Sequence, residues 1–154
     1  MNERREDWLL SEQFRVVQVS SLPYAHNPSR CDNAGLFAEA DWDGAAGRRF
    51  FESLTDQQRR SCHYHQLADW KLVAMISVRF FRACRDELMS KLDAALSRQD
   101  SRELYWLFHD PIAWGGEAPY VTNGQHRICA IRASGARLCV IDHERFDPYT
   151  APSL

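Results

Sequence analysis

Long apolar runs are absent from this sequence. No stretch reaches the roughly 18 consecutive apolar residues that a membrane helix requires. The opening residues, MNERREDWLL, are also too charged for the apolar core of a signal peptide. We therefore expect neither insertion into a membrane nor secretion.

Paired cysteines are also absent. The five cysteines, at positions 31, 62, 84, 129 and 139, are odd in number and nowhere have CxxC spacing. Without an export signal, such cysteines are typical of reduced thiols in a cytoplasmic protein. Cys129 and Cys139 lie in otherwise apolar stretches, which favours their burial.

An excess of basic residues is missing as well. The formal net charge is −2, which argues against a domain that binds nucleic acid through bulk charge. The basic pairs Arg48-Arg49 and Arg59-Arg60 are expected to be solvated faces of helices. The sequence is 45% hydrophobic and contains five Trp, so its 154 residues can form the core of one domain.

The order of predicted elements indicates an α+β fold. With no repeat or low-complexity linker in the sequence, we expect a single domain over residues 1–154, with a small mixed sheet and a helical block inserted at about residues 45–97. Patterns of β-branched, aromatic and turn residues predict strands over Phe14–Val19, Leu104–His109, Pro119–Thr122 and Arg137–Asp142.

The helical block carries its own signals. Thr55-Asp-Gln-Gln58 matches a capping box, which predicts that a helix begins there. Apolar and small residues recur at a spacing of three to four, which predicts one buried stripe, at Leu67, Trp70, Ala74, Ser77, Phe81, Cys84, Leu88 and Leu92. Ser97 to Ser101 are expected to end the block.

The segment TNGQHR joins a predicted strand to a helix over Gln125–Ala133, which Gly135 is expected to end. The amino end of a helix favours anions, and a glycine at the bend lets a ligand approach the backbone. His126 and Arg127 would add donors, although an Arg at this end opposes the helix dipole unless an anion is bound. The alternative is an ordinary turn, with Asn123 as the cap, Arg127 in solvent and His126 packed inside.

Two segments together resemble a known superfamily. The stretch from Gly124 to Gly135, with the pattern G-x-H-R-x-x-A-x-x-x-x-G, resembles the signature of ParB/sulfiredoxin-like proteins. NGQHR is similar to the DGQHR variant of DNA-modification systems. The early stretch VVQVSSLPYAHNPSR resembles the superfamily's opening strand and loop, which often ends in an N-P-x-R box.

The resemblance implies a strand-turn-helix that binds nucleotide phosphates, here those of ATP or CTP with Mg²⁺. Members include CTP-hydrolysing clamps, ATP-using sulfiredoxins, free-serine kinases and nucleases. By position, Gly124, His126 and Arg127 would contact phosphates. The turn would be shaped by Asn123 and Gln125, and the opposite loop would bring in Asn27 and Arg30.

Some features depart from the superfamily. Sulfiredoxins carry a cysteine where this sequence has Gln125, so their reductase chemistry is not expected, and Cys129 lies one helical turn further on. ParB clamps continue into a helix-turn-helix and a dimerising tail, whereas the sequence given stops soon after its last predicted strand. Chromosome segregation is therefore not expected. The helical block at about residues 45–97 corresponds to no segment that we can assign in the superfamily.

Three further groups of residues have side chains that occur in functional sites. Asp32 is the candidate catalytic carboxylate, with Glu39, Asp41 and Asp43 nearby, although a solvated acidic loop is the alternative reading. Cys62-His-Tyr-His65 invites a metal, but on a helix residues 63 and 65 point about 200° apart, so no metal site is predicted. Trp114, in a glycine turn, is the aromatic side chain that we expect to be exposed.

Two main functions remain open at this point. The first is a nucleotide-binding protein that hydrolyses ATP or CTP or transfers phosphate. The second is a non-catalytic module whose helical block binds a protein or DNA partner. A nuclease is a weaker third, because it would need a cluster of carboxylates around a metal and the sequence offers the Asp32 region alone.

Overall fold

The computed structural model describes residues 14–25, 31, 33, 44–82, 96–115, 121 and 123–143. Two strands and six α-helices are formed within these ranges. In chain order the elements are β1 (Phe14–Gln18), the 3-10 helix η1 (Val19–Ser21), α2 (Gly44–Ser53), α3 (Asp56–Ser61), α4 (His63–Gln66), α5 (Trp70–Arg82), α7 (Arg98–His109), α8 (Gln125–Ala133) and β2 (Leu138–Asp142).

The two strands come from opposite ends of the described chain and form an antiparallel ribbon, with Phe14 opposite Asp142 and Gln18 opposite Leu138. Single bridges widen this ribbon. Ala113 pairs in parallel with Asp142 and antiparallel with Asn123. The predicted α+β class is confirmed. The sheet within the described residues is a two-stranded antiparallel pair, and a parallel direction occurs there in the single bridge between Ala113 and Asp142.

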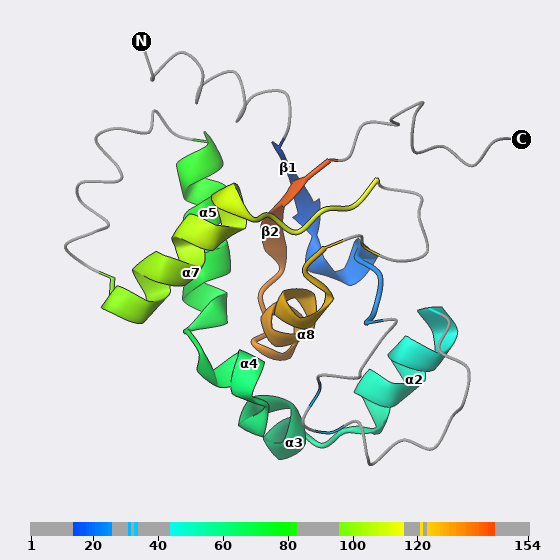
Figure 1. Ribbon diagram of the computed structural model, residues 1–154. Coiled ribbons are helices and arrows are strands. Elements are labelled where there is room, and N and C mark those ends of the chain that lie inside the picture. The colour runs from blue at the N-terminus through cyan, green and yellow to red at the C-terminus, as the bar shows by residue number, and fades with distance from the viewer. Residues whose placement is uncertain are drawn as a thin grey trace, which may run out of the picture.

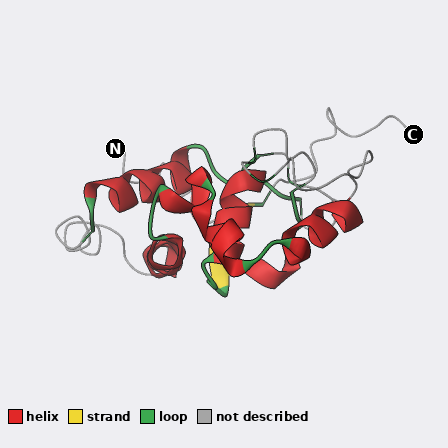
Figure 2. Ribbon diagram, turned by 90° about the horizontal axis from the view of Figure 1, so that it is seen from below, coloured by secondary structure: helices red, strands yellow, loops and turns green. Residues whose placement is uncertain are grey.

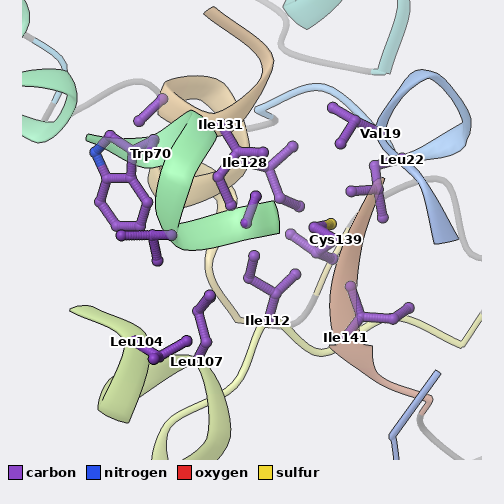
Figure 3. Close-up of a cluster of buried hydrophobic side chains, with 14 of the residues drawn as sticks. Val19, Leu22, Trp70, Leu104, Leu107, Ile112, Ile128, Ile131, Cys139 and Ile141 are labelled. Atoms are coloured by element: carbon purple, nitrogen blue, oxygen red, sulfur yellow. The ribbon is translucent and has the colours of Figure 1, made fainter. Parts of the chain in front are cut away.

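The strand β2 is buried on both of its faces. Cys139 and Ile141 join the larger apolar cluster together with side chains of α5, α7 and α8 (Figure 3). Val140 points to the opposite face, as alternation along a strand requires, and packs with Phe14 and Val78. The ribbon therefore lies in the middle of the core, although it is small beside the surrounding helices (Figure 2).

The helices α5 and α7 lie side by side next to the ribbon, and α8 lies near the centre of the fold (Figure 1). Within α5, the buried residues Trp70, Val73, Ala74 and Ser77 follow helical spacing. The Trp70 indole Nε1 donates to the Tyr64 carbonyl at 2.7 Å, which fixes α4 against the start of α5. The predicted stripe is therefore confirmed in α5, whereas Leu67 is exposed, and the stripe's positions beyond Arg82 lie outside the described residues.

The predicted strand over Leu104–His109 is wrong, because these residues form the second half of α7. Ser97 begins this helix, since its side chain accepts a hydrogen bond from the Asp100 amide at 3.1 Å. Leu96 and Ser97 lie outside the helices, where the helical block was expected to end, but residues 98–101 already belong to α7. The buried residues Asp100, Glu103, Leu104 and Leu107 recur at helical spacing and pack the helix on the core.

Other predicted elements agree with the structure. The first strand, the helix over Gln125–Ala133 and the last strand are confirmed. So is the capping box, because the Gln58 amide donates to Thr55 and the Gln58 side chain accepts from the Thr55 amide. Gly135 follows α8 in the left-handed region, with φ +80°, as its predicted role in ending the helix requires. The predicted strand at Pro119–Thr122 lies outside the described residues except for Val121, which is buried.

The packing of β2 and α8 also buries the thiols of Cys139 and Cys129, to different extents. Cys139 is fully buried, and this burial raises the pKa of its thiol to about 12. Cys129 is half-buried, and burial, reinforced by the nearby Cys62, raises its thiol pKa to about 11. Both thiols are therefore protonated at neutral pH and are weak nucleophiles.

Candidate functional site

The turn before α8 is built on Gly124. This residue has φ +91° and ψ 20°, a left-handed conformation that glycine adopts at little cost. A Cβ at this position would lie 2.8 Å from Cγ1 of Ile112, closer than packing allows. Glycine is therefore required here twice, once by the backbone conformation and once by the close approach of the Ile112 segment.

The amino end of α8 differs from those of two other helices in the fold. Thr55 and Ser97 cap α3 and α7 with side-chain oxygens. Gly124 has no side chain with which to cap α8, and the first turn of α8 contains no acidic residue. The positive end of this helix dipole is therefore not balanced by a charge from its own first turn.

Asn123 forms hydrogen bonds that hold the turn in place. Its side-chain amide donates to Oδ1 of Asp110 at 2.9 Å and to the Pro111 carbonyl at 2.8 Å. Its own carbonyl accepts from the Ala113 amide at 3.1 Å. These three bonds connect the start of α8 to the chain that leaves α7, so Asn123 holds the turn in place.

The Arg127 side chain folds back over this turn. One terminal nitrogen lies 3.3 Å from the position that a Cβ of Gly124 would occupy. The other donates to the Trp106 carbonyl, in the last turn of α7, at 3.3 Å. Burial lowers the pKa of the guanidinium, and the charges of Asp110 and Glu103 act in the opposite direction. The cation is thus partly buried and has two carboxylates in its vicinity.

His126 points toward a different part of the molecule. Its ring stacks on the Tyr64 ring of α4, with centroids 4.6 Å apart and planes 6° from parallel. The other neighbour of Tyr64 is His63, at 4.1 Å. His126 therefore helps hold α8 on α4, while Arg127 reaches α7. Gln125, at the first position of the helix, is half-buried.

The residues expected to face this turn from the early loop are Asn27, Arg30 and Asp32, and all three lie outside the described residues. Their approach to the phosphate, and the catalytic role of Asp32, stay predictions. The site as described is therefore formed by the turn at Asn123–Gly124, the first turn of α8 and the end of α7.

The structure adds two carboxylates that the sequence did not single out. Glu103 is only 8% exposed, and its burial raises the pKa of its carboxyl group, against the effect of the Arg127 and Arg102 charges. Asp110 is exposed and accepts the Asn123 bond. In the sequence, Asp110 directly follows the strand predicted over Leu104–His109. Pairing these acids with Arg127 required the position of α7.

The Cys62-His-Tyr-His65 group forms no metal centre in the described part of the chain, where no set of three His, Cys, Asp or Glu side chains is arranged to hold an ion. His63 packs on Tyr64, and His109 stacks on Tyr105 at 3.8 Å. Among the aromatic residues, Trp114 is half-buried and packs against the core, so its predicted exposure is only partial. Trp106 is 40% exposed on α7.

Comparison with known proteins matches the chain to no protein-family model, no curated protein and no solved structure. Among the described residues, no helix combines the length and the apolar character needed to cross a membrane. The class that fold and site define is thus a small α+β domain in which a glycine turn and a partly buried arginine lie at the start of a central helix.

Proposed function

We propose that this chain is a nucleotide-binding protein of the ParB/sulfiredoxin-like class. The phosphates of ATP or CTP, with Mg²⁺, would bind at the turn before α8. The observation that carries the proposal is the position of the Arg127 guanidinium beside the amino end of α8, 3.3 Å from the Cβ position of Gly124, the N-cap residue that has no side chain. Helix amino ends and arginine both favour phosphate oxygens.

The hydrogen bond that Arg127 makes to α7 is a weak one. Its bond to the Trp106 carbonyl is 3.3 Å long, beyond the common range near 2.9–3.0 Å for such bonds. Releasing that bond costs little, whereas a phosphate offers two short charge-assisted bonds. Glu103 and Asp110 compete for the same cation. An incoming anion would therefore bind best if Mg²⁺ balances those carboxylates.

The other motif residues have supporting roles in this proposal. Asn123 positions the turn through Asp110 and Pro111. His126 orients α8 through its stack on Tyr64. Gln125 shapes the first turn, and Asn27 and Arg30 would close the site from the opposite loop. If phosphate is also hydrolysed or transferred, Asp32 would be the catalytic carboxylate, as the base or as a ligand of Mg²⁺.

A second candidate is a module without catalysis, which binds a protein or DNA partner through the helical block. The observation that favours it is the exposure of large apolar side chains on that block, where Leu67 is 37% and Met75 is 44% exposed. Exposed apolar groups of this size are common at interfaces, although they also occur singly on ordinary surfaces.

Calorimetry with ATP, CTP and GTP, each with Mg²⁺, tests the first candidate. Arg127→Gln should weaken binding of the preferred nucleotide roughly tenfold to a hundredfold, because a bond to a charged group contributes about 1.5–3 kcal/mol. Arg98→Gln, on the exposed start of α7, is the matched control and should bind like the wild type.

The proposal fails if no nucleotide binds, or if Arg127→Gln binds as tightly as the wild type while its circular dichroism shows a native fold. Phosphate release, measured on the same samples, separates the two candidates. Release at the rate of buffer alone, despite binding, favours the module without catalysis.

A further inference from the structure

A basic groove lies where α5 meets the segment that joins α8 to β2. Among the described residues, this cavity of about 390 Å³ is lined by four cations and by no carboxylate; the cations are Lys71, Arg79 and Arg82 of α5 and Arg137, just before β2. All four side chains are exposed. Within the described residues, none of the four has a carboxylate partner in an ion pair. Their charges are therefore available to a ligand.

A second cavity continues from the first. It has a volume of about 800 Å³ and shares Ala136, Arg137 and Leu138 with the groove on α5. Arg59 and Arg132 also line it. The carboxylate among its described lining residues, Glu52, is already bound to Arg48, with Nε and Oε1 2.9 Å apart. The two cavities thus form one basic band, made of Arg59, Lys71, Arg79, Arg82, Arg132 and Arg137.

The band concentrates positive charge on a molecule whose net charge is −2. The helix α5 contributes three of the six cations and has no acidic residue along its length. A row of cations without acids matches a row of phosphates, which are spaced along a nucleic-acid backbone. The near-neutral composition conceals this local charge, because net charge averages over the whole sequence.

The wider cavity also contains aromatic surfaces. The Arg132 guanidinium lies 3.8 Å from the centroid of the Tyr24 ring, and the Arg59 guanidinium lies 4.3 Å from that of Phe51. Arg132 is held in place by bonds to the Val19 and Leu22 carbonyls, at 3.2 and 2.6 Å. Fixed guanidinium and aromatic planes in a basic groove are the features that stack the bases of single strands.

We propose that the basic band binds single-stranded nucleic acid. The exposed cations of the α5 groove contact its phosphates, and the cavity around Tyr24 and Arg132 takes up a base. A duplex does not fit as well, because its bases are stacked inside and cannot enter a cavity. The band lies beyond the carboxyl end of α8, and the turn at Gly124 lies at its amino end, so this site is separate from the proposed nucleotide site.

Fluorescence anisotropy with labelled 20-nucleotide single strands of DNA and RNA tests the proposal. The slope of log affinity against log salt should be about −3, near −0.7 for each of four phosphate contacts. The double variant Arg79→Glu with Arg137→Glu should bind at least about tenfold more weakly, with a slope near −1.5. Its control, Arg98→Glu with Arg102→Glu on α7, makes the same change of charge outside the band and should bind like the wild type.

Tyr24→Ala separates base stacking from charge, because it should weaken single-strand binding without changing the salt slope. The proposal is overturned if neither strand binds at 50 mM salt, if the control weakens binding as much as the band variant, or if a duplex binds more tightly than a single strand. It is also overturned if polyglutamate of equal charge displaces the strand as well as unlabelled single-stranded DNA does, since the band would then accept any polyanion.

Discussion

At the scale of single residues, Gly124 and Arg127 define the turn before α8. Gly124 supplies a backbone conformation that other residues rarely adopt, and it leaves space for Ile112. Arg127 joins the same turn to the last turn of α7 through the Trp106 carbonyl. A cation near a helix carboxyl end is favourable, so Arg127 also stabilises α7 when no phosphate is bound.

Gly124 and Gly135 both have a left-handed backbone, so their alanine variants form a matched test of the packing between Gly124 and Ile112. Gly124→Ala should lower the free energy of unfolding by about 2–4 kcal/mol, because it adds a clash with Ile112 to a backbone cost of about 1–2 kcal/mol. Gly135→Ala should cost only the backbone term, since nothing lies within 4 Å of its Cβ position. Urea denaturation measures both. Equal losses for the two variants would show that Ile112 does not restrict the turn.

The sequence predicted the conformation of this turn but not its contacts. Asn123-Gly124 followed by a helical pattern is a local signal, and the structure confirms the helix it predicts. The bonds of Asn123 to Asp110 and of Arg127 to Trp106 depend on a segment that is distant in the chain. Because that segment was predicted to be a strand, no pattern in the sequence could place its carbonyl and carboxylates beside the turn.

At the scale of elements, the amino end of α7 connects two helices. The Asp100 amide donates to the Ser97 side chain, and Oδ1 of Asp100 accepts from the Asp69 amide, just before α5, at 2.9 Å. Asp100 is buried, and a buried carboxylate needs such bonds. The start of α7 and the start of α5 are therefore fastened together by one side chain.

Because of this connection, we expect Asp100 to contribute more to the free energy of unfolding than Asp56, although both lie in the first turn of a helix. Asp100→Ala should lower the free energy of unfolding by about 1–3 kcal/mol, because the Asp69 amide loses its bond to a carboxylate that is itself buried. Asp56→Ala, at the start of α3, should cost under about 1 kcal/mol, since its side chain is 82% exposed and pairs only with Arg59. Thermal and urea unfolding compare the two. A loss for Asp100→Ala no larger than that for Asp56→Ala would contradict this role.

The wrong prediction of a strand over Leu104–His109, which belongs to α7, has a physical cause. The run LYWLFH is rich in aromatic residues, which are common in strands. Its helical spacing appears only when Asp100 and Glu103 are counted as buried along with Leu104 and Leu107. Charged residues are rarely buried, so the pattern was not visible in the sequence. The capping box at Thr55 was predicted correctly because all of its atoms lie within four residues.

At the scale of the whole molecule, α8 separates two charged regions. Its amino end faces α7, with Arg127 near two carboxylates. Its carboxyl end leads into the basic band, where six cations gather. Net charge and composition could not predict this division, because they average over the chain. The sequence did predict the α+β class, since that follows from the local patterns of strands and helices.

The central claim is that the turn at Gly124 binds the phosphates of a nucleotide, and amide correlation spectra recorded by NMR test it most directly. During a titration with ATP or CTP and Mg²⁺, the amide signals of residues 124–127 should shift and saturate, and Arg127→Gln should abolish these shifts. The claim is contradicted if the signals of residues 124–127 stay in place at millimolar nucleotide, above all if those of Arg79 and Arg137 move instead.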